Sequence, residues 1–166
     1  MIRSRLRTCA IALALVTAGC GADPSGETGR EGTMNQEEAA ERGQEHIDNA
    51  AAVLPDTLEL EPVGGVNFAA CDDPTDGGSR DRVTVGRSYW LDGLPSEDND
   101  TNIDLLYEYW TANGYHVLTD SRPEDVFVSV EHEEDFFRTS VQASAEGSLS
   151  IGASSPCVWP EGTPHS

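Results

Sequence analysis

The sequence predicts an α+β domain, a two-layer sandwich in which an antiparallel sheet is covered on one face by two helices. Apolar residues recur at helical spacing in two stretches, one near residues 35–54 and one near residues 101–113. After residue 114 come short segments in which apolar residues alternate with polar ones, separated by turn-forming residues. This alternation indicates a sheet with one buried face and one solvent-exposed face.

The first helix is predicted from its start signal and its apolar stripe. Asn35 is a good N-cap, and Glu38 follows three residues later to complete a capping box. Apolar residues then recur at helical spacing until Pro55: Ile47, Ala50, Ala51 and Leu54. Because this stripe is thin, we expect the helix to pack at the edge of the body.

The second helix has the clearer pattern. Thr101 is the predicted N-cap, and Asp104 completes a second capping box. Gly114 is expected to end the helix, since glycine readily adopts the left-handed conformation of a helix C-terminus. The apolar stripe of this helix consists of Ile103, Leu106, Tyr107 and Trp110.

Extended segments are predicted on both sides of the second helix. The first two are short and are broken by proline and glycine, and the last four form a meander separated by polar turns. In the meander, alternate positions stay apolar, so one face of each strand should be buried. The predicted segments are residues 58–60, 66–70, 82–91, 115–118, 126–131, 136–145 and 149–157.

The N-terminus has the layout of a bacterial export signal. Three arginines lie within the first seven residues, and an apolar run over residues 9–16 follows them. Two small residues then precede Cys20, which resembles the lipobox of bacterial lipoproteins. In that family the signal is cut before the cysteine, which then carries a diacylglyceryl anchor with palmitate-type acyl chains. Thr17 stands where leucine is usual, and the alternative is cleavage near Ala18 with plain secretion.

The overall layout resembles the small lipoproteins of actinobacterial-type genomes. It combines a lipobox, a flexible tether, one α+β domain and a late Ser-Pro-Cys. The resemblance implies attachment to the outer face of the cytoplasmic membrane through the lipid on Cys20, and it implies no activity or further cofactor. The expected divisions are a signal peptide, the lipidated cysteine with its tether, one domain and a disordered tail, over residues 1–19, 20–34, 35–160 and 161–166.

The cysteines separate into an N-terminal pair and a domain pair. Cys9 lies in the signal and Cys20 would be consumed by the lipid. Cys71 and Cys157 remain, and in an oxidising compartment we expect them to form a disulfide. Closing such a long loop would restrict the unfolded chain by about 4–5 kcal/mol.

The charge of the chain excludes several partners. The net charge is −20, there is no lysine, and all thirty acidic residues lie after Cys20. Nucleic-acid binding needs clustered cationic side chains, so we expect no such partner. An anionic lipid surface would repel the domain as well. A basic partner or a cation stays open, and the acidity also keeps an exported protein soluble and monomeric.

One acidic segment begins like a calcium-binding loop. Asp98, Asp100 and Asn102 supply oxygens at alternate positions. The sixth position is Ile103 instead of glycine, and the twelfth is Tyr109 instead of glutamate, so the coordination sphere does not close as in an EF-hand. We therefore interpret the segment as an acidic helix start and expect no metal ion or cofactor.

No catalytic motif is present. Residues 131–135 begin like a zinc-protease signature but lack its second histidine, so we interpret them as a solvated turn. The alternative is a weak cation site that includes Asp72, Asp73 or Asp76. The histidines that could act as a general base have no identifiable partner in the sequence: His46, His116 and His132. The protein is therefore predicted not to be an enzyme.

Aromatic residues provide the candidate binding surface, namely Tyr89, Trp90 and Trp159. Tyr89 and Trp90 are adjacent on a strand and must point to opposite faces. We predict a non-enzymatic binding or adaptor module at the cell envelope, with an envelope protein as partner. The alternative is a carrier that holds a lipid or another small apolar ligand between helices and sheet. A cation-dependent cell-wall enzyme is the third hypothesis.

Overall fold

The structure, a computed structural model, describes residues 33–71 and 79–164. The predicted signal peptide, the lipidation site Cys20 and the acidic residues Asp72, Asp73 and Asp76 lie outside the described residues. None of the described helices combines the length and the apolar character that crossing a bilayer requires.

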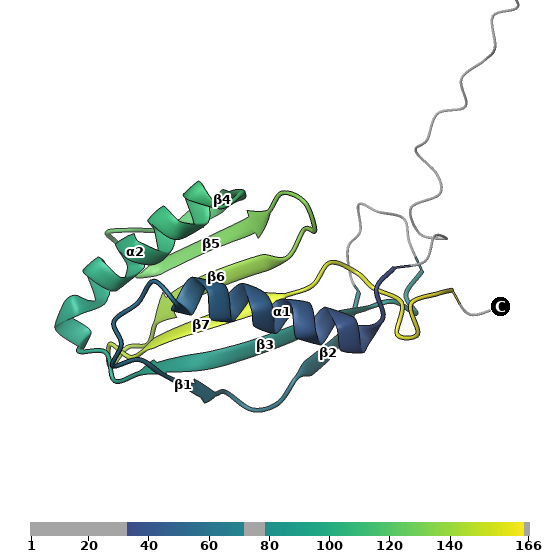
Figure 1. The fold of residues 1–166 in the computed structure, drawn as a ribbon, viewed down its shortest axis with the longest axis horizontal. Coiled ribbons are helices and arrows are strands. Elements are labelled where there is room, and N and C mark those ends of the chain that lie inside the picture. The colour runs from purple at the N-terminus through teal and green to yellow at the C-terminus, as the bar shows by residue number, and fades with distance from the viewer. Residues whose placement is uncertain (1–32, 72–78, 165–166) are drawn as a thin grey trace, which may run out of the picture.

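The described residues form two helices packed on one face of an open, seven-stranded antiparallel sheet, which confirms the predicted α+β class (Figure 1). A short 3-10 helix, η1 (Ser96–Asp98), precedes the second helix. The remaining elements are α1 (Gln36–Ala51), β1 (Glu59–Pro62), β2 (Asn67–Ala70), β3 (Val83–Asp92), α2 (Asn99–Ala112), β4 (Tyr115–Asp120), β5 (Phe127–His132), β6 (Arg138–Ala143) and β7 (Leu149–Ser154).

The long strand β3 connects the two halves of the sheet. The strand order is β1-β3-β7-β6-β5-β4, and β2 pairs with β3 beside β1. β1 and β2 follow one another in the same direction along one edge of β3, and the chain bulges between them around Gly64, which has a φ of 73°. β4 to β7 form the predicted meander, with β7 returning to pair with β3.

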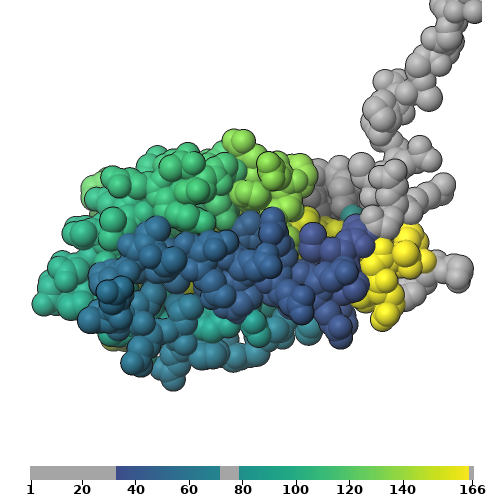
Figure 2. All heavy atoms as spheres, in the orientation of Figure 1, coloured from purple at the N-terminus to yellow at the C-terminus, as the bar shows by residue number. Residues whose placement is uncertain are grey.

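The hydrophobic core lies between the helices and the sheet. Figure 2 shows the side chains of α1 and α2 covering most of the sheet on this face. Alternate residues of the central strands point toward the helices, as the period of a strand requires. The fully buried members of this core include Ile47, Ile103, Leu106, Trp110, Val128, Val130, Val141 and Ile151.

The start of α1 confirms the predicted capping box. The side-chain oxygen of Asn35 accepts hydrogen bonds from the backbone N–H groups of Glu37 and Glu38 at 2.9 and 3.0 Å. The Glu38 carboxylate accepts the Asn35 N–H in return at 2.9 Å. Two of the N–H groups that a helix start leaves unpaired are thereby satisfied.

The predicted start of the second helix is wrong. α2 begins at Asn99 instead of after Thr101, and Thr101 is exposed within its first turn. The start of the helix contacts a distant part of the chain, because the Asn99 side chain donates a 2.8 Å hydrogen bond to the carbonyl of Gly147, in the turn between β6 and β7. The predicted end is confirmed, since Gly114 follows the helix with a φ of 81°.

The predicted disulfide is present. Cys71, directly after β2, is bonded to Cys157, three residues past β7, across a sequence separation of 86 residues. Near this bridge the two ends of the described chain meet, because the Thr33 N–H donates to the carbonyl of Gly162 at 2.8 Å. The hydrogen-bonded chain thus continues past residue 160, where we predicted the domain to end.

Candidate functional site

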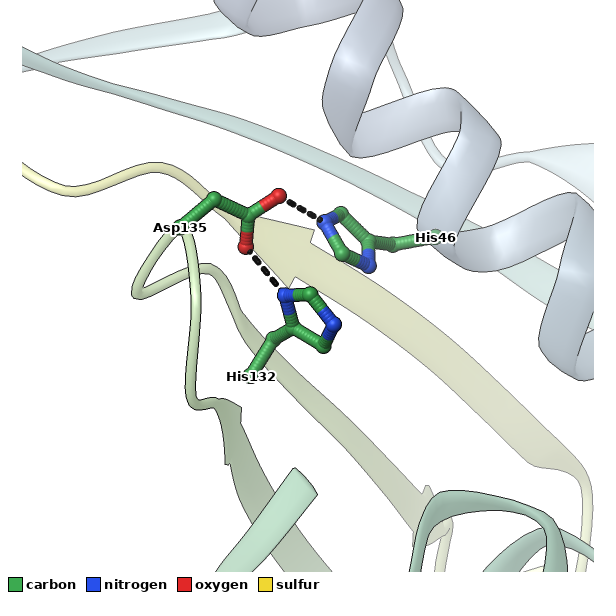
Figure 3. A group of neighbouring side chains, drawn as sticks. All are labelled: His46, His132 and Asp135. Carbon is green, nitrogen blue, oxygen red and sulfur yellow. Dashed lines mark hydrogen bonds and ion pairs between the residues drawn. The ribbon is translucent and has the colours of Figure 1, made fainter. Parts of the chain in front are cut away.

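A cluster of two histidines and one aspartate joins α1 to the turn between β5 and β6 (Figure 3). His46 projects from α1, His132 is the last residue of β5, and Asp135 lies in the turn. The Asp135 carboxylate uses one oxygen for each histidine: Oδ2 lies 3.0 Å from Nε2 of His46, and Oδ1 lies 2.7 Å from Nδ1 of His132. We call these three residues the histidine cluster.

The shape of the turn directs Asp135 toward the helix. The His132 N–H donates to the Phe137 carbonyl at 2.8 Å, and the Phe136 N–H donates to the His132 carbonyl at 3.0 Å. Phe136 adopts a φ of 60°, a left-handed conformation that costs a residue with a side chain about 1–2 kcal/mol. The turn is also held from outside, because the Glu133 N–H donates to the Gly114 carbonyl at 2.8 Å. Strained residues of this kind concentrate at functional sites.

The histidine cluster is largely shielded from solvent. The side chains of His46, His132 and Asp135 are 6%, 14% and 16% exposed. The His46 ring stacks on the Phe137 ring with centroids 5.0 Å apart, and the Tyr115 hydroxyl lies 2.5 Å from Nδ1 of His46. These contacts fix the orientation of the His46 ring.

Arg42 supplies a positive charge at the rim of the cluster. Its Nε donates to Oδ2 of Asp135 at 2.8 Å, and its Nη1 donates to Glu45 at the same distance. The Arg42 side chain is 45% exposed, so the guanidinium lies between solvent and the buried carboxylate.

The environment sets the protonation of the cluster. Burial raises the pKa of Asp135, but hydrogen bonds from Arg42 and His132, together with the charge and hydrogen bond of His46, outweigh it and lower the pKa to about 2. Burial lowers the pKa of His46, against the opposing effect of Asp135, and burial raises the pKa of Tyr115. At neutral pH the carboxylate is therefore ionised and the phenol is protonated.

The ionised carboxylate also fixes the histidine tautomers. Because an ionised carboxylate only accepts hydrogen bonds, Nε2 of His46 and Nδ1 of His132 must carry the protons that face Asp135. In a neutral His46 ring, Nδ1 is then an acceptor, and the Tyr115 hydroxyl donates to it. The result is an ordered chain of donors that runs from Tyr115 through His46 to Asp135.

A small polar hollow of about 180 Å³ opens beside the cluster, between α1 and the end of α2. The residues of the cluster that line it are His46 and His132, so both rings can be reached from the surface. The other lining residues are Arg42, Glu45, Asn49, Tyr109, Asn113 and Tyr115.

A larger hollow, of about 470 Å³, lies over the strands that meet at the centre of the sheet. We call it the open-face hollow, because its exposed side chains occupy the strand positions that point away from the helices. Arg138 stands at its rim, 61% exposed, and its Nε donates to Glu131 at 2.7 Å. Lining residues include Gly86, Ser88, Ser140, Gly152 and Ser154.

Two of the three aromatic residues predicted as a binding surface are buried, which corrects that prediction. Tyr89 is 9% exposed, because it points under α1 and its hydroxyl donates to Gln44. Trp159 is 3% exposed, in the segment where the two ends of the described chain meet. Trp90 is half-buried on the opposite face of β3 from Tyr89, and its role stays a prediction.

The oxygens of the calcium-like segment do not converge. Asp98 and Asp100 are exposed at the start of α2, whereas Asn102 is 1% exposed inside the helix. Within residues 33–71 and 79–164, the one group of three His, Cys, Asp or Glu residues whose donor atoms come close enough for a shared ion is the histidine cluster.

This cluster was not predicted from the sequence. The interpretation of residues 131–135 as a solvated turn holds for Glu133 and Glu134, which are exposed, but is wrong for His132 and Asp135. His46 and Asp135 are 89 residues apart, so no local pattern connects them. One signal existed: His46 falls on the buried stripe of α1, with Ala39, Gly43 and Ala50.

No family model and no curated protein matches the chain. Among solved structures, it is similar to LppA from Mycobacterium tuberculosis, a protein assigned as a lipoprotein. The identity is 14% and the TM-score is 0.37, over 75% of this chain and 78% of LppA. At this level the likeness carries no functional information.

Proposed function

We propose that the protein is a monomeric lipoprotein on the outer face of the cytoplasmic membrane, which binds a polar component of the cell envelope without catalysing a reaction. The pattern around Cys20 supports the anchor, and an anchor raises the effective concentration of a domain against its neighbours in the envelope. The observation that carries the binding role is the open-face hollow.

The open-face hollow suits a polar partner. Gly86 has no side chain there, and a Cβ at this position would meet only the Ala153 carbonyl oxygen, at 3.8 Å, so a ligand can approach the backbone closely. The hydroxyls of Ser88 and Ser140 both donate and accept hydrogen bonds. Trp90 lies two residues from Ser88 on the same face of β3 and adds an aromatic surface beside the hollow.

The two rival functions fit the described residues less well. A carrier of an apolar ligand needs a cavity between helices and sheet, but Trp110, Ile103 and the strand residues below them fill that space. Both hollows described above have polar linings instead. A cation-dependent wall enzyme of the predicted kind needs several converging carboxylates, and the histidine cluster contains one.

Metabolic labelling tests the anchor. Cells that express the protein are fed an alkyne-bearing palmitate, and the membrane and soluble fractions are compared for wild type and Cys20→Ala. We expect label on the wild-type protein in the membrane fraction and none on the variant. An unlabelled wild-type protein in the soluble fraction would contradict the anchor.

Sedimentation with purified cell envelopes tests the open face. Ser88→Trp would fill the open-face hollow without touching the core, because Ser88 is exposed. We expect it to weaken co-sedimentation of the domain with envelopes at least tenfold. The matched control is Glu41→Trp, which adds the same bulk to the exposed side of α1. Equal binding by the two variants would show that the open face is not the binding surface.

A further inference from the structure

The geometry points to a second site: we propose that His46, His132 and Asp135 bind a divalent transition metal ion, with Zn²⁺ as the fitting example. Each residue offers one donor atom, and these atoms all lie within 4.8 Å of one another. Imidazole nitrogens and a carboxylate are ligands that zinc accepts, and three protein ligands leave a fourth position for water. This site is separate from the open face and does not depend on the lipid anchor.

The donor atoms are already close to the spacing that the ion needs. Zinc binds nitrogen and oxygen at about 2.0–2.2 Å, so neighbouring ligands of a tetrahedral ion are roughly 3.3 Å apart. The two histidine–aspartate pairs stand at 3.0 and 2.7 Å, the first to Oδ2 and the second to Oδ1, so each histidine already lies near one carboxylate oxygen, and the ion would take one of the two oxygens. The widest separation, within 4.8 Å, has to close by roughly 1 Å or more, which rotations of the side chains can supply.

Metal binding leaves the number of protons on the protein unchanged. The ion replaces the protons on Nε2 of His46 and Nδ1 of His132, and each neutral ring takes its proton back on the other nitrogen. Nδ1 of His46 then donates to the oxygen of Tyr115, whose hydroxyl reverses from donor to acceptor. No net proton is released. An oxygen that accepts the second N–H of a ligating histidine is the usual outer partner of such a ligand.

Arg42 competes with the ion for Asp135. Its guanidinium donates to Oδ2, the oxygen that also faces His46. The arginine has an alternative partner, because it already bonds Glu45 at 2.8 Å, and its side chain is 45% exposed. Binding of the ion therefore shifts Arg42 toward Glu45. Removing this positive charge should strengthen metal binding, whereas it would loosen a cluster that serves only to hold α1 on the turn.

The proposed metal site is shielded from solvent but can still be reached by an ion. The three side chains are between 6% and 16% exposed, which protects bound metal from competing water. The polar hollow of about 180 Å³ beside them gives the ion an entry path and has room for the water that completes its coordination.

Calorimetric titration with zinc chloride tests the proposal. The protein is purified as the cell makes it, in detergent where it carries lipid, and is stripped of metal with a chelator. We expect one zinc ion per chain with a dissociation constant at or below the micromolar range. Replacing a ligand, in His132→Gln or His46→Gln, should weaken binding at least 100-fold. His116→Gln, which removes an exposed histidine outside the cluster, is the matched control and should bind as wild type.

Arg42→Met keeps all three ligands and should bind zinc several-fold more tightly than wild type. We expect this variant to fold, since it alters a side chain that is nearly half exposed, so a change in its zinc affinity can be assigned to the lost charge. The proposal is overturned if wild type binds no zinc at stoichiometric concentration, or if His132→Gln and His46→Gln, shown to be folded, bind as tightly as His116→Gln. Weaker binding by Arg42→Met would also count against it. The envelope and labelling experiments are unaffected by any of these results.

Discussion

The two faces of the sheet carry polar groups in opposite ways. On the covered face, the side chains of Asp135 and His46 are 16% and 6% exposed, and hydrogen bonds to defined partners offset the cost of about 1–3 kcal/mol that leaving either group unpaired would carry. On the open face, Ser88 and Arg138 border an open hollow and solvent competes for their hydrogen bonds. The side chains of the histidine cluster are therefore already ordered by their own hydrogen bonds. Those of the open face would become ordered only when a partner binds.

The largest expected effect compares two tryptophans, one from each face. Trp110→Ala removes a fully buried side chain from the core-facing side of α2 and should lower the free energy of unfolding by about 3–5 kcal/mol. Trp90→Ala removes a half-buried side chain from the open face and should cost about 1 kcal/mol. Urea denaturation of the two variants measures both values. Equal losses would mean that the open face is packed as tightly as the covered one.

The next effect compares two carboxylates. Asp135→Asn leaves Arg42 and two histidines without their shared anion and should destabilise the metal-free protein by about 2–4 kcal/mol. Glu131→Gln weakens a pair with the exposed Arg138 and should cost about 1 kcal/mol or less. Chemical denaturation in chelator checks the ranking, which would be contradicted by a greater loss in Glu131→Gln.

The stability of the protein should depend on pH through Asp135. The pKa of Asp135 is lowered from 3.8 to about 2 on folding, so the folded state binds fewer protons and its stability rises with pH in this range. The stabilisation is therefore fully present above about pH 4 and is lost as the pH falls toward about 2. Measured without metal, the stability difference between wild type and Asp135→Asn should shrink over this window. A difference that stays constant from pH 5 to about pH 2 would contradict the lowered pKa.

The smallest effect concerns the turn that presents Asp135. Phe136 is 58% exposed and has a φ of 60°, so Phe136→Gly should relieve strain and stabilise the protein by up to about 1 kcal/mol. Phe136→Ala is the control, because alanine keeps the strain and loses the same side chain. Thermal unfolding separates the two, and the account fails here if alanine stabilises as much as glycine.

Local signals predicted most of the fold. Asn35 with Glu38 marked the start of α1, Gly114 marked the end of α2, and the alternation of apolar residues marked the strands of the meander. The disulfide was predicted from the oxidising compartment that the export signal implies and from the two cysteines that remain outside the signal and the lipidation site. Each of these features depends on residues near one another in the chain or on pairing by elimination, which is the information that one sequence holds.

The predictions that were wrong concern features that depend on long-range contacts. The first residue of α2, Asn99, bonds to the carbonyl of Gly147 in a distant turn, and Trp159 is buried where the ends of the described chain meet. The histidine cluster needs the turn at Phe136 and the placement of α1 at once. A sequence shows that His46 lies on a buried stripe but does not show which residue will face it.

The most direct test of the account is a nitrogen NMR spectrum of the histidine rings, recorded while the metal-free protein is titrated with Zn²⁺. It observes His46 and His132 on the covered face and His116, which is paired with Glu131 on the open face, in one experiment. We expect the ring-nitrogen chemical shifts of His46 and His132 to change together up to one equivalent of zinc, while those of His116 stay unchanged. Unchanged His46 and His132 signals, or an equal response from His116, would contradict it.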